Sequence, residues 1–162
     1  MVKSDNLDEM RMSANLVDAL LNDEMRLHVK ICQEKGITRE ELENTTELPQ
    51  NMAYTRYVLE AGFSGDFLDL MAALAPCVMG YGEIGARLKV ERTSDVYSDW
   101  INTYSSQDYQ NLCIDLGKVI DSAIIRRLGR NFYECERWDK LVTHFQQATT
   151  LESSFWDMGL KG

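Results

Sequence analysis

A cysteine that directly follows a proline is the residue of this sequence best suited to chemistry. Pro76 and Cys77 lie in the apolar run Leu70–Tyr81, whose pattern is otherwise helical. A proline inside a helix removes a backbone hydrogen bond and costs about 3 kcal/mol, so we expect a helix break here with a purpose beyond packing. A thiol becomes a nucleophile where positive charge, a helix start or a base favours its thiolate. Cys77 is therefore a candidate nucleophile, and the alternative is a small apolar core residue.

Tyr81 and Glu152 are the polar groups that could work with this thiol. Tyr81 follows Cys77 by four residues, so a helix that resumes after the proline places both side chains on one face. Glu152 lies on an apolar stripe with Phe145 and Phe155. Because burial raises the pKa of a carboxyl, such a residue could give and take a proton near neutral pH. The alternative is a carboxylate at the edge of the stripe that reaches water.

Aromatic residues recur on the predicted core-facing sides of several helices. They are Tyr54, Tyr57, Tyr97, Trp100 and Tyr104. Aromatic residues at helical spacing more often belong to a core than to a binding site, but each buried phenol needs a hydrogen-bond partner. If several converge on one cavity, they would form a slot for a flat polar heterocycle.

A carboxylate and an imidazole also stand four residues apart, at Glu24 and His28, where they could bind a metal. The only other histidine is His144, and the Glu-x-x-His repeats of di-iron bundles are absent. This shortage of ligands favours a buried structural ion pair, or a pair beside the pocket, over a metal site.

The elements that must position these groups are helices. The chain has only two prolines and ten glycines, and its aliphatic residues recur at three- and four-residue spacing. Capping and breaking residues predict helices over Asn6–Glu34, a short segment opened by the capping box Thr38–Glu41, Pro49–Gly62, Asp66–Lys89, a short segment capped by Ser94–Asp95, Ser105–Gly129 and Glu134–Met158. We therefore predict an all-α protein built as an antiparallel helical bundle or a related compact array of helices.

Composition limits the remaining possibilities. With 162 residues and 44% hydrophobic content, the chain suits a single domain over 1–162. The net charge of −9 and the lack of a basic stripe argue against nucleic acid and anionic membranes as partners. The charged first residues do not form a signal peptide, and the run Leu70–Tyr81 is too short to span a bilayer. Four separated cysteines fit reduced thiols. We therefore expect a cytoplasmic protein.

Five motifs in order carry a resemblance to a known family. They are Glu24-x-x-x-His28, Tyr54-x-x-Tyr57, Ala75-Pro76-Cys77-x-x-x-Tyr81-x-Glu83-Ile84-Gly85, Tyr97-x-x-Trp100-Ile101-x-x-Tyr104 and Leu151-Glu152-x-x-Phe155-Trp156-x-Met158. On these motifs, the chain resembles the TenA/thiaminase II family over nearly its whole length.

The resemblance implies a haem-oxygenase-like helical bundle and a hydrolase of thiamin salvage that needs no cofactor or metal. Enzymes of this kind release hydroxymethylpyrimidine from aminomethylpyrimidine or thiamin, so the implied partner is a small aminopyrimidine. Cys77 then corresponds to the nucleophile that adds to the pyrimidine ring, and Glu152 to the carboxyl group that shuttles protons. The positions that line the pyrimidine slot are matched by Tyr54, Tyr81, Tyr104 and Phe155. Assembly as a homotetramer is also implied.

One departure from the family leaves alternatives open. Family members carry further helices before the point that matches Met1, with an aspartate that holds the pyrimidine amino group and an aromatic that stacks on the ring. This chain has no counterpart, so we expect a form that is short at its N-terminus. A non-catalytic pyrimidine-binding or assembly protein with the same fold is one alternative. A di-metal oxidase that uses Glu24 and His28 is another, disfavoured by its small ligand set.

Overall fold

The structure, a computed structural model, describes residues 2–160, and this part of the chain forms helices and no strand. The all-α prediction is therefore confirmed. The helices gather into two compact units that divide after Leu48. The expectation of a single domain over 1–162 stays a prediction.

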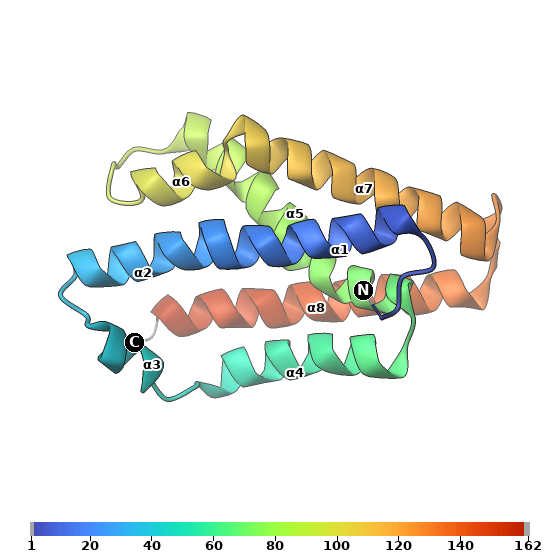
Figure 1. The fold of residues 1–162 in the computed structure, drawn as a ribbon, viewed down its shortest axis with the longest axis horizontal. Helices are drawn as coiled ribbons and strands as arrows, with labels where there is room; N and C mark the ends of the chain where they lie inside the picture. Colours follow the sequence, from blue (N-terminus) through green and yellow to red (C-terminus); the bar gives the residue numbers. More distant parts are fainter. Residues whose placement is uncertain (1, 161–162) are drawn as a thin grey trace. The chain divides into compact units, whose positions relative to one another are not determined.

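The first unit is a helical rod followed by a short helix (Figure 1). It comprises α1 (Leu7–Ala19), the π-helical turn η1 (Leu20–Glu24), α2 (Met25–Glu34) and α3 (Arg39–Glu43). The rod matches the helix predicted over 6–34, and the Asn6 side chain begins it by accepting the Glu9 amide at 2.9 Å. In the predicted capping box before α3, Thr38 and Glu41 satisfy each other's backbone amides.

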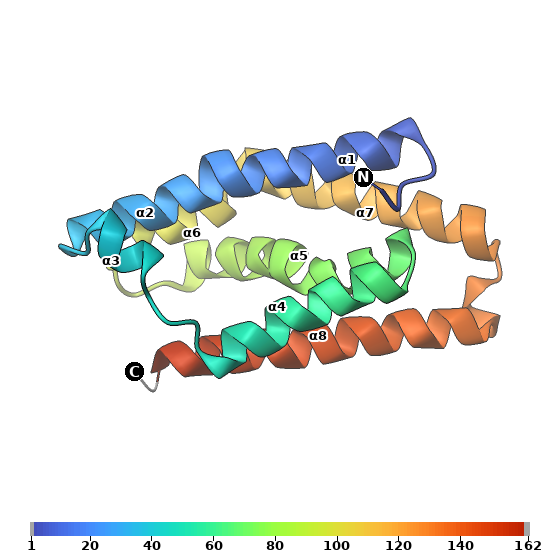
Figure 2. The ribbon, with the colours of Figure 1, turned by 60° about the horizontal axis from the view of Figure 1, so that its bottom comes forward.

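The second unit is a helical bundle around a central helix. It comprises α4 (Pro49–Ser64), α5 (Phe67–Glu91), α6 (Ser98–Tyr104), α7 (Gln107–Leu128), the 3-10 turn η2 (Phe132–Glu134) and α8 (Glu136–Leu160). α4 and α8 run side by side in opposite directions, and α5 contacts α4, α6, α7 and α8 (Figures 1 and 2). The candidate nucleophile thus lies on the helix that the others of this unit surround.

α5 continues through its proline, so the predicted break is wrong. Asp66 caps the helix in a capping box with Asp69, and the segment stays α-helical past Pro76. Pro76 is itself buried in an apolar part of α5. The burial offsets the hydrogen bond that the proline removes. Cys77 and Tyr81 therefore lie one regular turn apart on the same helix.

Two helix starts differ from the sequence prediction by one to a few residues. α6 begins at Ser98 after a turn over 95–97, and the Ser98 hydroxyl donates to the Asp95 carbonyl at 2.7 Å. Ser106, not Ser105, caps α7 by accepting the Tyr109 amide.

α5 is also the one helix among residues 2–160 that is long and apolar enough to cross a membrane by length and composition. It is longer than the run 70–81 on which the expectation against a membrane rested. Within its most apolar window, 44% of the residues are buried inside the protein. The core helix of a soluble protein meets the same criterion, so length and composition alone do not identify a membrane span.

Two glycines on α5 allow α6 and α7 to approach closely. A Cβ at Gly85 would lie 2.7 Å from the Tyr104 Cβ, and a Cβ at Gly82 would lie 2.7 Å from the Cys113 Sγ. Gln110 of α7 reinforces this contact by donating to the carbonyl oxygens of Gly82 and Tyr104, each at 2.9 Å. Gly85 therefore brings Tyr104 against α5, and Gly82 brings α7 against it.

We expect Gly85→Ala to lower the free energy of unfolding by about 1–3 kcal/mol, because the added methyl forces α6 away from α5. Gly80→Ala on the same helix is the matched control, since nothing lies within 4 Å of the new Cβ. It should be neutral or stabilise by up to about 1 kcal/mol. Urea unfolding followed by circular dichroism measures both, and equal effects would refute the close-approach argument.

Candidate active site

The polar centre of the second unit is a hydrogen bond between α5 and α8. Tyr81 Oη donates to Glu152 Oε1 at 2.8 Å, and Glu152 is only 8% exposed. Burial and the adjacent carboxyl raise the pKa of Tyr81 above its ordinary value, so the phenol keeps the proton that it donates. The bond occupies Oε1 and thereby fixes the direction in which Oε2 points.

Two buried polar atoms beside this bond have no well-formed hydrogen bond among the described residues, although the first of them lies close enough to the Cys77 thiol and the Glu152 carboxyl to interact with both. They are Tyr54 Oη on α4 and Glu152 Oε2. Burial, the nearby Cys77 thiol and the Glu152 carboxyl raise the pKa of Tyr54, which places these three groups together. An unsatisfied buried polar group costs about 1–3 kcal/mol and is rare in proteins. The pair therefore marks a position where a ligand can supply the missing hydrogen bonds.

Cys77 approaches this position from α5. Its Sγ donates to the Leu74 carbonyl at 3.1 Å, which is the contact of a protonated thiol. The half-buried side chain packs against an apolar cluster that includes Tyr54 and Ala148, and its thiol also acts on the pKa of Tyr81. A thiol, two phenols and a carboxyl thus converge from α4, α5 and α8.

Four rings extend from this centre toward the surface, and we call Tyr81, Trp100, Tyr104 and Trp156 the aromatic cluster. The Tyr81 ring centroid lies 5.1 Å from that of Tyr104 and 5.6 Å from that of Trp156. Trp100 packs on Tyr104 at 4.5 Å and meets Trp156 edge-to-face at 5.8 Å. Tyr104 is fully buried, whereas Trp156 is 44% exposed. The aromatic cluster therefore leads from the core to solvent beside Glu152.

The structure brings five of the six predicted site residues together, namely Tyr54, Cys77, Tyr81, Tyr104 and Glu152. Phe155 is half-buried one turn after Glu152, but its ring makes no ring contact with the aromatic cluster among residues 2–160. The sequence named Trp100 among the aromatic residues that could form a slot, but it assigned neither Trp100 nor Trp156 as a site residue. Their spacing was the available signal, since each stands four residues from a predicted site residue on the same helix.

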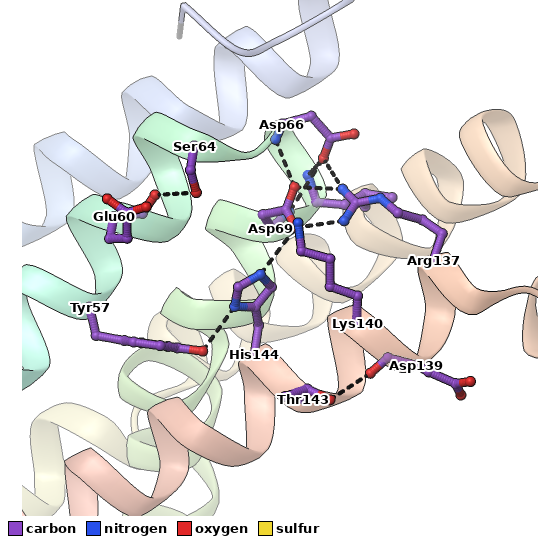
Figure 3. Close-up of polar contacts among 11 residues, drawn as sticks. Tyr57, Glu60, Ser64, Asp66, Asp69, Arg137, Asp139, Lys140, Thr143 and His144 are labelled. Atoms are coloured by element: carbon purple, nitrogen blue, oxygen red, sulfur yellow. Dashed lines mark hydrogen bonds and ion pairs between the residues drawn. The ribbon is translucent and has the colours of Figure 1, made fainter.

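A second polar group of residues, nearer the starts of α5 and α8, holds a buried carboxylate (Figure 3). Asp69 is 1% exposed and accepts from both terminal nitrogens of Arg137, at 2.6 Å for Nη1. Asp66 also accepts from Arg137, and the Lys140 ammonium lies 3.6 Å from Asp69. Although burial acts to raise it, these hydrogen bonds and charges hold the pKa of Asp69 well below its ordinary value.

An imidazole extends this group to α4. His144 Nε2 lies 3.2 Å from Asp69 Oδ1, and His144 Nδ1 lies 2.9 Å from Tyr57 Oη (Figure 3). We call these six residues, Asp66, Asp69, Arg137, Lys140, His144 and Tyr57, the Asp69 cluster. It ties together the same three helices that carry Tyr54, Cys77 and Glu152. Sequence reasoning identified Asp66 only as part of a helix start.

The sequence favoured a buried ion pair, or a pair beside the pocket, at Glu24 and His28, and the buried pair is not found because the imidazole is not buried. His28 is exposed on α2, and Glu24 is half-buried at the end of η1. The error arises because the apolar stripe around them was taken as a core face. Among residues 2–160, no group of three or more His, Cys, Asp or Glu side chains could hold a metal ion.

An apolar cavity of about 340 Å³ lies elsewhere, between α5, α7 and α8. Its walls include Leu68, Met71, Ile124 and Leu141, with Asp121 as a charged residue in the lining. None of the six predicted site residues lines it, so it is separate from the convergence around Cys77.

Comparisons with known proteins agree with this fold. The family model described as TENA/THI-4/PQQC matches residues 1–162. An aminopyrimidine aminohydrolase from Halalkalibacterium halodurans is 36% identical over 160 residues, which are 97% of this chain and 69% of that protein. The crystal structure of a TenA family transcription regulator from Silicibacter sp. TM1040 is 53% identical, with a TM-score of 0.96 over 99% of this chain and 72% of that one. A TenA homologue from P. horikoshii OT3 is 26% identical, with a TM-score of 0.81 over 97% and 70%.

We expect the protein to lose stability in acid partly through Asp69. Because its pKa is depressed on folding, the stability that its charge contributes is present above about pH 4 and is lost as the pH falls further. Asp69→Asn should lower the free energy of unfolding at neutral pH and flatten its decline below about pH 4. Urea unfolding at a series of pH values from about pH 3 to about pH 7 measures the slope.

The matched control is Asp115→Asn, which removes an exposed carboxylate paired with Lys118. That pair should contribute less than about 1 kcal/mol, and the acid slope of the variant should equal that of the unmodified protein. An unchanged slope in Asp69→Asn would show that Asp69 does not govern the acid loss.

Proposed function

Because this chain belongs to the TENA/THI-4/PQQC family, we propose that it is an aminopyrimidine aminohydrolase of the thiaminase II type that acts in thiamin salvage. Its fold is the all-α, haem-oxygenase-like bundle of that family. The proposed reaction replaces the nitrogen substituent on the exocyclic methylene of an aminopyrimidine by hydroxyl. The substrate is aminomethylpyrimidine or thiamin, and the product is hydroxymethylpyrimidine.

The observation that carries this proposal is the pair of unsatisfied buried atoms beside a thiol. Among residues 2–160, neither Tyr54 Oη nor Glu152 Oε2 has a well-formed hydrogen bond, and Tyr54 lies close to both Cys77 and Glu152. An aminopyrimidine offers ring nitrogens and an amino group, which are the acceptors and donors that a phenol and a carboxyl can bind. The proposed slot therefore places a polar heterocycle within reach of the nucleophile.

The proposed first step, written for aminomethylpyrimidine, joins Cys77 to the pyrimidine ring. The thiol gives its proton to the Glu152 carboxylate, the sulfur forms a bond to a ring carbon, and the displaced electron pair moves onto a ring nitrogen. That pair then returns toward the exocyclic methylene and breaks its bond to the amine. The amine leaves with the proton that Glu152 received.

Hydrolysis reverses these movements with water. The methylene takes hydroxyl from a water molecule, whose remaining proton passes to Glu152. The bond from sulfur to the ring then breaks, and Glu152 returns its proton to Cys77. One water is consumed, and the protein ends in its starting state. Tyr81 keeps Glu152 Oε1 occupied, so that Oε2 serves as the proton carrier.

The remaining predicted residues would shape the slot. Tyr104 is fully buried against Tyr81 and would form one wall for the ring. Phe155 would extend the slot along α8. We also propose, as the resemblance implies, a cytoplasmic location and assembly as a homotetramer. Sedimentation velocity measures the oligomeric state directly.

We expect Cys77→Ala to abolish release of hydroxymethylpyrimidine while the circular dichroism spectrum and melting temperature stay close to those of the unmodified protein. Cys135→Ala is the matched control, because the Cys135 thiol also donates to a carbonyl three residues earlier, at 3.0 Å. It should keep full activity. Product formation by Cys77→Ala at the unmodified rate would refute the nucleophile, and substrate binding without turnover in the unmodified protein would favour a non-catalytic binding protein.

We expect Glu152→Gln to lower kcat by about 10²- to 10⁴-fold, because an amide of the same shape cannot carry the proton. KM for aminomethylpyrimidine should change far less, since the amide can still hydrogen-bond. Steady-state kinetics measure both constants. A raised KM with unchanged kcat would assign Glu152 to binding alone.

A further inference from the structure

We propose that Trp100 and Trp156 form a binding site for flat, positively charged leaving groups beside the pyrimidine slot. This inference rests on the proposed function, because it concerns the part of the substrate that departs. In this inference, the two tryptophans determine how strongly the protein prefers a substrate with a cationic heteroaromatic leaving group over one with a small amine.

The location of the two indoles supports this role. The Tyr81 ring lies 5.8 Å from that of Trp100 and 5.6 Å from that of Trp156, and Tyr81 donates its hydroxyl proton to Glu152. Glu152 is the group that meets the leaving group in the proposed reaction. The indoles are therefore one ring away from the position where the bond to the leaving group breaks.

The exposure of the aromatic cluster supports it independently. The cluster is closed at Tyr104, which is fully buried, and open at Trp156, which is 44% exposed. Trp156 and Trp100 meet at 89°, so their faces form a corner rather than a stack. Large aromatic side chains that are partly exposed in this way commonly contact ligands, because they offer a wide apolar surface without a charge to desolvate.

The chemistry of such a corner suits a cation with a flat face. Indole has the most favourable π-face among the side chains for a cation within about 6 Å of the ring. A quaternary heteroaromatic ring, such as the thiazolium of thiamin, offers both a charge and a face to stack. A small amine has no flat ring that could stack on an indole. The corner should therefore favour the thiazolium substrate over aminomethylpyrimidine.

The test compares two substrates in one variant. Trp156→Leu should lower kcat/KM for thiamin by about 5- to 30-fold and change kcat/KM for aminomethylpyrimidine by less than about twofold. Trp156→Phe, which keeps a ring, should recover part of the loss. Trp138→Leu is the matched control, because Trp138 lies on the same helix but packs on Phe132 with centroids 4.8 Å apart. It should change the ratio between the substrates by less than about twofold.

A binding measurement separates this inference from the proposed function. Thiamin binding to Cys77→Ala, measured by calorimetry, should weaken by about 5- to 30-fold when Trp156→Leu is added. If the unmodified protein turns over neither substrate, the proposed function fails and this affinity difference still decides the inference. Equal losses for both substrates, or unchanged thiamin affinity, would overturn it.

Discussion

The ion pair between Arg137 and the buried Asp69 is the interaction on which the rest of the second unit depends. A carboxylate that is 1% exposed cannot stay charged without a partner, and Arg137 supplies two hydrogen bonds from α8. The pair joins the first turns of α5 and α8. His144 and Tyr57 extend the connection to α4. Because helices are stiff, a contact at one end sets which side chains meet three to four turns farther along.

The order of residues along α8 shows how the ion pair positions the candidate site. Its first turns carry Arg137 and His144 in the Asp69 cluster, its middle carries Glu152, and its last turns carry Trp156. α5 follows the same order, since it presents Asp69 to the Asp69 cluster and Tyr81 to Glu152 farther along. The two helices therefore run in the same direction at the site, so one register brings both pairs together. Helix register thus determines which reactive groups meet.

Sequence periodicity predicted the helices, because helix formation depends on local chemistry, and the resemblance to the TenA/thiaminase II family supplied most of the residues that converge. Capping residues such as Thr38 and Asp66 can be recognised from residues no more than four positions away. Cys77 and Glu152 stood out because they are polar or reactive residues on apolar stripes. The prediction failed where contacts between residues far apart in the sequence determine the structure. The helix continues through its proline because the surroundings are buried, and Arg137 carries no local mark of its partner 68 residues earlier.

The two unsatisfied atoms, Tyr54 Oη and Glu152 Oε2, lower the stability of the fold while providing the hydrogen-bonding groups that the proposed function needs. Replacing either group by an apolar side chain of similar shape would remove a desolvation cost, so selection for thermal stability alone would tend to erase the site. A ligand that satisfies both atoms binds the folded chain only and therefore stabilises it by mass action. The lifetime of the protein in a cell would then follow the supply of its substrate.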